Sequence, residues 1–348
     1  MKILWDMRLY SFGYRNRGIG MYVSSITEAF TKSGLCTDIV IWGQKECLPQ
    51  HLVSFPVIEY KPGNWKNDLF HIPCLQYKYG IDLFHYWISC GPLWRIGSGF
   101  DICPSIATVF DLGVQLWDNP YLNAVKRSFY WKVQPSLLKK ASRVLCISQQ
   151  TCSDLTSFLP SVEGKVEVLA FPVPEVKCPS KARRQRIFIV LGGAPHKNLK
   201  SVVLAFHQFR KAQPDYKLVI CGEIKREQEL PECLDNVEFA DMNKYHNLLC
   251  IASGLVFCSL YEGLGLPPLE AMNAGCPLIV SEIPVMWEIC NDAAVFVNPL
   301  SIDDIARGMR DIHEEHEYWS EKSSRRIAHL RDSGKPAEQL AAIYEGYV

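Results

Sequence analysis

The hydrophobic residues of this chain fall into short runs, and longer stretches with helical spacing lie between several of them. Met21–Ser33 and Tyr121–Ala141 show the helical spacing in the first half. The runs that we interpret as strands there are Lys2–Trp5, Asp38–Trp42, Asp82–Tyr86, Ser105–Phe110 and Arg143–Ile147. This alternation of strands and helices predicts a mostly parallel sheet covered by helices.

A proline-rich segment followed by a basic run interrupts this pattern between Phe171 and Arg186. Proline clusters and charge runs are typical of linkers, and we interpret the basic run as a solvated loop. The boundary predicts an N-terminal domain of residues 1–175 and a C-terminal domain of residues 176–348. The last helix of the chain is a candidate to cross back to the first domain.

The alternation then restarts, so the chain contains two α/β halves of similar size. The predicted strands are Ile187–Leu191, Lys217–Cys221, Val237–Phe239, Gly254–Cys258 and Pro277–Val280. The predicted helices are Leu199–Ala212, Tyr245–Ala252 and Pro267–Asn273. Open α/β sheets bind ligands beyond the carboxyl ends of their strands, so two such domains facing each other make a cleft.

Composition and charge narrow the classes of function. The 348 residues carry 37 Lys and Arg against 37 Asp and Glu, which argues against nucleic-acid binding by bulk charge. The longest uncharged stretch that is mainly apolar, Leu248–Leu260, is too short to span a bilayer. An acidic residue stands already at Asp6, which no signal peptide has. We therefore expect a cytoplasmic protein with no nucleic-acid partner.

Fourteen cysteines are many for such a protein, but they do not have the spacing of a metal site. The closest two are Cys146 and Cys152, and others lie inside apolar runs, among them Cys221, Cys250 and Cys258. We expect reduced, mostly buried cysteines that act as small hydrophobic residues, and no zinc.

The segment Ser259–Gly275 is the richest part of the chain in candidate functional residues. It joins a strand, a glycine loop and the start of a helix, an arrangement that binds anions through free N–H groups and the helix dipole. Glu262 and Glu270 are eight residues apart, so they are expected to hold two ends of an extended ligand with phosphates between them. The alternative is that both carboxylates face solvent or cap the helix.

This segment resembles the glutamate–seven residues–glutamate motif of the retaining glycosyltransferases of family GT4. Gly192–Leu199 resembles the glycine-rich Lys-Asn loop of that family. Three N-terminal segments resemble elements of its mannosyltransferase-B-like branch, and one further segment resembles the element after the nucleotide site. These segments are Asp6–Arg8 followed by Arg17–Tyr22, then Leu83–His85, Thr108–Leu112 and Ala293–Pro299. The resemblance extends over most of the chain and implies the GT-B fold, two Rossmann-like α/β domains facing each other across a cleft.

The resemblance also implies roles for individual residues. Glu270 would accept hydrogen bonds from the ribose hydroxyls of a nucleotide-sugar, and Glu262 would contact hydroxyls of the donor sugar. Lys197 would neutralise the leaving diphosphate, because charge grows on the leaving oxygen. The remaining donor-site candidates are Gly18, Gly20, Gly193, Gly263, Gly265 and Leu266, with the amides of the last two on the diphosphate.

The sequence departs from the family at the acceptor side. Related enzymes carry a histidine where Phe110 stands, while Asp111 remains as a catalytic candidate and His85 as an acceptor-side candidate. Gly18 and Gly20 are expected in a loop that closes over the donor phosphates or the acceptor. They do not form a dinucleotide fingerprint, because Val23 takes the third glycine position.

The function implied is a retaining transfer of a hexosyl residue, mannose from GDP-mannose as the first choice, to a hydroxyl of a saccharide acceptor. The basic, aromatic stretch 121–143 is a candidate for peripheral contact with the inner membrane face, which would suit a lipid-linked acceptor in cell-surface polysaccharide synthesis. The alternative is an aromatic stripe packed in the core with a solvated basic face. No Asp-x-Asp occurs, so we expect neither metal nor cofactor. A UDP-sugar-dependent transferase, a nucleotide-sugar epimerase and a non-catalytic binding homologue stay open.

Overall fold

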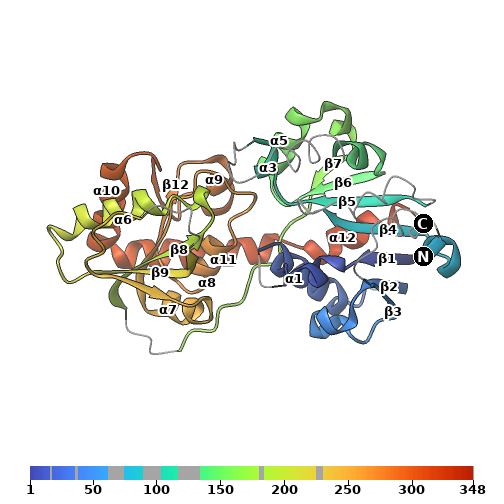
Figure 1. The fold of residues 1–348 in the computed structure, drawn as a ribbon, viewed down its shortest axis with the longest axis horizontal. Helices are drawn as coiled ribbons and strands as arrows, with labels where there is room; N and C mark the ends of the chain where they lie inside the picture. The colour runs from blue at the N-terminus through green and yellow to red at the C-terminus, as the bar shows by residue number, and fades with distance from the viewer. Residues whose placement is uncertain are drawn as a thin grey trace. The chain divides into compact units, whose positions relative to one another are not determined.

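The computed structural model describes residues 1–15, 18–35, 38–61, 74–88, 103–116, 134–179, 184–224 and 230–347. The chain divides into two compact units, each built on its own sheet (Figure 1). Unit 1 comprises Met1–Pro172 together with Gly334–Val348, and unit 2 comprises Val173–Ser333. The two parallel-strand α/β sheets confirm the predicted fold class.

The described strands of unit 1 form a seven-stranded parallel sheet in the order β3-β2-β1-β4-β5-β6-β7. Their bounds are β1 Lys2–Asp6, β2 Asp38–Gly43, β3 Val57–Glu59, β4 Leu83–Ile88, β5 Ser105–Val109, β6 Arg143–Cys146 and β7 Val166–Val168. The hydrophobic pattern predicts the five longer strands, whose near-continuous apolar runs suit a sheet covered on both faces. β3 and β7 have three residues each and are too short to show a period.

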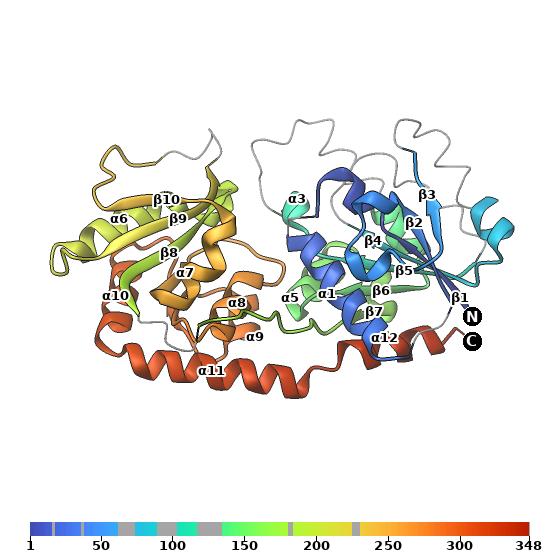
Figure 2. The same ribbon diagram turned by 90° about the horizontal axis from the view of Figure 1, so that it is seen from below.

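Helices cover this sheet on both faces. Helix α1 and helix α12, from opposite ends of the sequence, lie side by side (Figure 2). The rings of Phe30 and Tyr344 meet edge to face between them. The described helices of unit 1 are α1 Gly18–Lys32, α3 Gly113–Leu116, α5 Gln149–Phe158 and α12 Pro336–Glu345. Short 3₁₀ turns complete it: η1 Arg8–Phe12, η2 Lys45–Cys47, η3 Gln50–Leu52 and η5 Pro160–Lys165.

Gly18 and Gly20 lie in the first turn of α1, so the prediction that they sit in a closing loop is wrong. The reason is a close backbone approach that the sequence pattern does not show. A Cβ on Gly20 would lie 2.1 Å from the carbonyl oxygen of Tyr14, and the Tyr10 hydroxyl donates to the Gly20 carbonyl at 2.9 Å. Glycine is therefore needed at position 20 for packing at the start of the helix.

A buried chain of hydrogen bonds fixes α12 to the sheet of unit 1. Trp5 Nε1 donates to Tyr344 Oη at 2.9 Å, and Tyr344 Oη lies 2.6 Å from His85 Nδ1. His85 Nε2 lies 2.8 Å from Thr108 Oγ1. In the neutral imidazole one ring nitrogen donates and the other accepts, so the hydroxyls of Tyr344 and Thr108 satisfy both nitrogens of His85. His85 is fully buried, which corrects the expectation that it faces an acceptor.

We expect His85 to make unit 1 sensitive to acid. Burial lowers the pKa of His85 from 6.5 to about 3. Between these values the unfolded chain binds a proton that the folded chain does not, so stability falls as pH falls. The loss is about 1.4 kcal/mol per pH unit at most. The thermal midpoint should drop less between pH 6.5 and 4.5 in His85→Gln than in the wild type or in the exposed control His329→Gln. Equal drops in all three would contradict this assignment.

The described strands of unit 2 form a six-stranded parallel sheet in the order β10-β9-β8-β11-β12-β13. Their bounds are β8 Gln185–Gly193, β9 Lys217–Ile224, β10 Val237–Ala240, β11 Ala252–Phe257, β12 Leu278–Ser281 and β13 Val295–Val297. Strands β8 and β11 are central neighbours, with Val190 opposite Val256. The carboxyl ends of these two strands therefore open at the same edge of the sheet.

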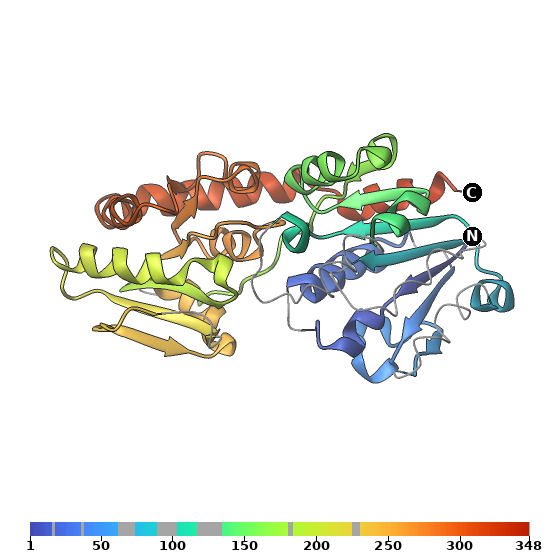
Figure 3. The same ribbon diagram turned by 45° about the horizontal axis from the view of Figure 1, so that its top comes forward.

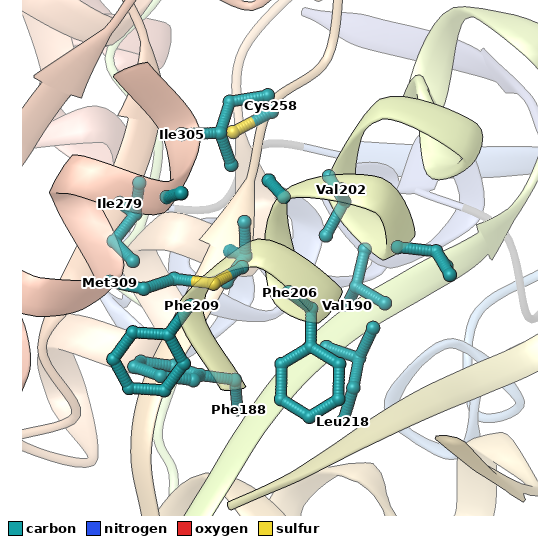
Figure 4. Packing of buried hydrophobic residues seen from close by; sticks show 14 of the residues in the cluster. Phe188, Val190, Val202, Phe206, Phe209, Leu218, Cys258, Ile279, Ile305 and Met309 are labelled. Carbon is teal, nitrogen blue, oxygen red and sulfur yellow. The ribbon is translucent and has the colours of Figure 1, made fainter. Parts of the chain in front are cut away.

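Helix α6 lies along one face of this sheet, beside α10 (Figure 3). Side chains of α6 such as Phe206 and Phe209 meet Phe188 and Leu218 of the strands and Met309 of α10 in one core (Figure 4). The described helices of unit 2 are α6 Leu199–Arg210, α7 Tyr245–Ile251, α8 Leu266–Asn273, α9 Pro284–Cys290, α10 Ile302–Glu314 and α11 His316–Ser333. The 3₁₀ turns are η6 Pro195–Lys197 and η7 Met242–Lys244.

Cys178 and Cys250 form a disulfide, so the prediction of reduced cysteines is wrong for this pair. The two residues are 72 positions apart, and the fold brings their Cα atoms to 5.4 Å by laying the segment before β8 against the end of α7. The other ten described cysteines are free thiols. Cys221 and Cys258 are buried as expected, and burial raises the pKa of Cys221 to about 12.

We expect reduction of this disulfide to destabilise unit 2. Opening the loop that it closes restores entropy to the unfolded chain, a loss of about 2–4 kcal/mol in the free energy of unfolding. Urea unfolding of air-oxidised protein, with and without dithiothreitol, measures the effect. Cys250→Ser should match the reduced wild type and not respond to reductant, whereas the exposed control Cys233→Ser should respond fully. Two free thiols in peptide mapping of oxidised protein would contradict the assignment.

The predicted basic helix at 121–143 lies partly outside the described residues, since nothing before Gln134 is described there. Residues 134–140 are helical, with Leu137 and Leu138 buried and Lys139 and Lys140 exposed. Arg17, the first residue of the segment Arg17–Tyr22, also lies outside the described residues. Among the described residues, no helix has the length and apolar character needed to cross a bilayer.

Candidate functional site

Two loops of unit 2 meet at the carboxyl ends of the central strands β8 and β11. The first runs from Gly193 through η6 to α6, and the second runs from β11 to the start of α8. The Leu260 N–H donates to the His196 carbonyl at 2.8 Å, which joins the loops directly. Asn198 at the end of the first loop has a left-handed backbone, and its side-chain amide donates to the Pro299 carbonyl at 2.7 Å. The segment after β13 therefore braces the first loop.

Lys197 and Glu262 form an ion pair between these two loops. Lys197 Nζ lies 2.6 Å from Glu262 Oε1 and 4.7 Å from the centre of the Phe257 ring. Their side chains are 19% and 13% exposed, so the pair is largely shielded but still reaches solvent. An ammonium group has three N–H donors, and Glu262 takes one of them. The pair thus holds a cation in place while leaving it donors for an anionic ligand.

The start of α8 adds amide donors beside this pair. Gly265 has φ 114° and directly precedes the helix, and a Cβ at this position would lie 2.7 Å from Met286 Cε. Pro267 and Pro268 occupy the first turn and have no N–H, while the first helical bond runs from Leu269 N to the Gly265 carbonyl. The N–H groups that can donate to an anion are therefore the amides at the end of the second loop, including that of Leu266.

Glu270 lies further along α8 and is almost fully buried, with 4% of its surface exposed. His246 of α7 places its Nε2 3.2 Å from Glu270 Oε1. This hydrogen bond is the main reason that the pKa of His246 is raised above its ordinary value. The adjacent Tyr245 is buried, and its pKa is raised well above 10 by burial first and by the Glu270 carboxylate second. Two neighbouring side chains of α7 therefore surround one carboxylate of α8.

The acceptor-side candidate Phe110 and the catalytic candidate Asp111 lie in unit 1, directly after the carboxyl end of β5. Asp111 is half-buried, and its Oδ1 accepts from the Gly113 N–H at 2.8 Å, which begins α3. Phe110 is buried with its ring edge-on to Tyr22, and Tyr22 stacks on Phe171 at 5.0 Å between ring centres. Where the family has a histidine, this chain has an aromatic residue packed into an aromatic cluster.

Asp6 and Arg8 form a buried pair at the end of β1. Arg8 donates to both carboxylate oxygens of Asp6 at 2.8 Å, and its guanidinium lies 3.6 Å from the centre of the Trp42 ring. Both side chains are almost inaccessible, so in this structure they organise the turn after β1. In the described part of the chain, no three His, Cys, Asp or Glu side chains group in a way that would bind a metal ion.

Part of this chain is similar to a known protein family and to named relatives. Residues 177–328 match the family of glycosyl transferases group 1. The O-antigen chain mannosyltransferase RfbU of Salmonella typhimurium is 26% identical over 239 residues, which cover 62% of this chain and 66% of RfbU. The alignment thus spans about two thirds of that relative.

Solved structures give the same fold over the whole chain. The sucrose-phosphate synthase of Thermosynechococcus elongatus superposes with a TM-score of 0.77 at 18% identity, covering 99% of this chain and 98% of that one. Anabaena HepE, solved in complex with UDP and glucose, has a TM-score of 0.75 at 15% identity, covering 99% and 100%. These likenesses show that the chain has the GT-B fold. Unit 2 carries the match to the group 1 glycosyl transferases, which covers residues 177–328.

His246 is the site residue that the sequence did not indicate. A single histidine on a helical stretch has no motif around it, and its partner Glu270 is 24 residues further along the chain. Seven of the predicted site residues lie in unit 2, at the loops after β8 and β11 and along α8. They are Gly193, Lys197, Glu262, Gly263, Gly265, Leu266 and Glu270.

Proposed function

We propose that this protein transfers a hexosyl residue from a nucleotide-sugar to a hydroxyl of a saccharide acceptor, with retention of the anomeric configuration. The observation that carries the proposal is the Lys197–Glu262 pair beside the start of α8, with the buried Glu270 carboxylate further along the same helix. A cation and helix amides suit a diphosphate, and two carboxylates suit the hydroxyls at either end of the donor. Unit 2 would bind the donor and unit 1 the acceptor.

The residues of unit 2 give this chemistry a mechanism. Negative charge develops on the diphosphate as the glycosidic bond breaks, and Lys197 is already positioned by Glu262, so it stabilises that charge without rearrangement. The Leu266 amide and the dipole of α8 add to the same effect. Glu262 would orient the sugar, and the Glu270 carboxylate would accept hydrogen bonds from the ribose. The leaving phosphate would help to take the acceptor proton, with no metal required.

The donor favoured is GDP-mannose, and the acceptor favoured is a lipid-linked saccharide in cell-surface polysaccharide synthesis. The support is the name of RfbU, an O-antigen chain mannosyltransferase. A UDP-sugar is the alternative donor, because HepE was solved with UDP and glucose. The basic stretch 121–143 would bring a cytoplasmic enzyme to the membrane surface where a lipid-linked acceptor lies.

Phe110 favours a second candidate, a homologue that binds the nucleotide-sugar without transferring the sugar. Its ring packs on Tyr22 inside unit 1, so this position offers no proton-carrying group. Binding of the nucleotide-sugar by unit 2 would not depend on Phe110. Transfer of the sugar would have to use Asp111, the polar residue next to Phe110 in the sequence.

The test is product formation from GDP-mannose, UDP-glucose or UDP-N-acetylglucosamine with a lipid-linked saccharide extract, with magnesium or with EDTA. A glycosylated lipid product with an α-linkage by NMR, formed equally in EDTA, is the expected result. Donor isomerisation without acceptor would identify an epimerase. Donor binding with no product on any acceptor would favour the binding homologue and contradict transfer.

A further inference from the structure

The pairing of His246 with Glu270 has no counterpart in the motif that the sequence carries. Glu270 is almost completely buried on α8, while the His246 side chain on α7 is 51% exposed. A carboxylate can only accept, so the imidazole nitrogen at 3.2 Å must carry a hydrogen. That hydrogen bond engages Oε1 of Glu270, and Tyr245 of the same helix also interacts with this carboxylate.

We propose that His246 is a positioning residue of the donor site, which fixes the Glu270 carboxylate for the ribose hydroxyls and, when protonated, makes the affinity for nucleotide-sugars depend on pH. This inference rests on the proposed function, since it assumes that a nucleotide-sugar places its ribose at Glu270. It assigns His246 a task that neither the glutamate motif nor the Lys-Asn loop performs.

The helix that carries His246 is held in place at both ends. Tyr245 at its start is buried, and its hydroxyl lies 3.5 Å from the Pro267 carbonyl of α8. Cys250 at its end is joined to Cys178. Arg184 donates to the Leu249 carbonyl at 2.6 Å and to the Ala274 and Gly275 carbonyls, which ties the ends of α7 and α8 together. The exposed imidazole therefore extends from a rigid helix toward a buried carboxylate.

Among the charged groups around His246, Glu270 is the one that controls its protonation. The titratable or charged groups on α7 and the elements packed against it are Glu270 on α8, Lys244 on η7, Arg184 just before β8, Arg186 within β8, and Tyr245 and Cys250 on α7 itself. Arg186 pairs with Asp215, Cys250 is in the disulfide, and the raised pKa of Tyr245 keeps its phenol neutral. The hydrogen bond to Glu270 raises the pKa of His246 above its ordinary value.

The direction of the pH effect follows from the charge of the donor. A sugar diphosphonucleotide is anionic at all pH values of interest, and its diphosphate has no proton to lose between pH 6 and 8.5. Protonated His246 adds a positive charge near the ribose and strengthens its bond to the carboxylate. Loss of that proton removes this charge and weakens the hydrogen bond to Glu270. The affinity for the nucleotide-sugar should therefore fall by about five- to ten-fold from pH 6 to 8.5.

Calorimetric titration of the full-length protein with GDP-mannose and with UDP-glucose between pH 6 and 8.5 tests this. His246→Gln keeps an N–H donor without the charge and should bind with a flat pH profile, within about three-fold of the wild type at pH 8.5. His246→Ala should also be flat but bind about ten-fold more weakly, because Glu270 loses its partner. Asn247→Ala, exposed on the same helix, should keep the wild-type slope.

A second measurement does not depend on donor binding. The NMR titration of the His246 ring in the free protein should move to lower pH in Glu270→Gln, since the carboxylate that stabilises the imidazolium is gone. An unchanged titration midpoint there, or a wild-type pH slope in His246→Gln, would overturn the inference while leaving the donor site intact. Absence of binding by the wild type to either nucleotide-sugar would instead overturn the proposed function, and this inference with it.

Discussion

Replacement of Lys197 by alanine is expected to lower sugar transfer by about 10²- to 10³-fold, the usual cost of removing one preorganised group that stabilises developing charge. Lys197 Nζ is held 2.6 Å from Glu262 at the loop junction of unit 2, so the variant removes the cation from the place where the diphosphate would bind. Affinity for the nucleotide-sugar should weaken as well, because the ground-state diphosphate is already anionic. Steady-state kinetics and calorimetry separate the two effects.

Lys200→Ala is the matched control for this variant. Lys200 lies three positions further on, on the exposed side of α6, and carries the same charge. Its substitution changes the net charge of unit 2 equally but should leave transfer and binding within about two-fold of the wild type, as expected for an exposed surface charge. If Lys197→Ala bound the nucleotide-sugar with unchanged affinity, the placement of the diphosphate at this loop junction would be wrong.

Glu262→Ala is expected to lower sugar transfer by about 10²-fold, for a different reason from Lys197→Ala. The carboxylate would contact the sugar and not the nucleotide, so binding of the nucleotide-sugar should weaken while binding of the free nucleoside diphosphate stays the same or tightens. Tightening has a direct cause, because Lys197 is no longer neutralised by the carboxylate 2.6 Å away. Comparing GDP with GDP-mannose, and UDP with UDP-glucose, measures this difference.

The exposed Glu282, which follows β12, supplies the control for that comparison. Glu282→Ala removes the same charge from unit 2 but should not distinguish the nucleotide from its sugar conjugate. Equal losses of affinity for GDP and GDP-mannose in Glu262→Ala would contradict the assigned contact with the sugar. Full transfer by Glu262→Ala would contradict its catalytic role altogether.

The central strands were predictable because their hydrophobic runs are long and interrupted by clear helical spacing. β8 is found over Gln185–Gly193 around the predicted Ile187–Leu191, and β11 over Ala252–Phe257 beside the predicted Gly254–Cys258. Short edge strands such as Val57–Glu59 and Val166–Val168 carry too few residues for a period to appear. The order in which the strands pair depends on tertiary packing. The hydrophobic pattern along the chain predicts the fold class but not this order.

The errors come from contacts that the sequence pattern does not show, and two of these contacts join residues far apart in the sequence. β4 runs to Ile88, beyond the predicted end at Tyr86, so His85 is inside the strand and meets Tyr344 at a separation of 259 residues. Cys250 meets Cys178 at a separation of 72. Gly20 looked like a loop glycine, but the carbonyl of Tyr14 requires it at the start of a helix. No local propensity encodes contacts of this kind.

The candidate site was predictable only as far as its residues stand in motifs. Glu262 and Glu270 stand in one segment and Lys197 in another, and each was named from its motif. The 2.6 Å contact between Lys197 and Glu262 spans 65 residues and emerges only from the adjacency of β8 and β11 in the sheet. His246 stands in no motif, so the bond that it makes to Glu270 appears only in the folded chain.

The measurement that tests the central claim most directly is calorimetric binding of GDP-mannose, GDP, UDP-glucose, UDP-N-acetylglucosamine and UDP to the wild-type protein, with magnesium and with EDTA. We predict that one nucleotide series binds, with equal affinity under both conditions, and that the series that binds identifies the donor class. Failure of every ligand to bind, with or without magnesium, would contradict a nucleotide-sugar site at the β8 and β11 loops of unit 2.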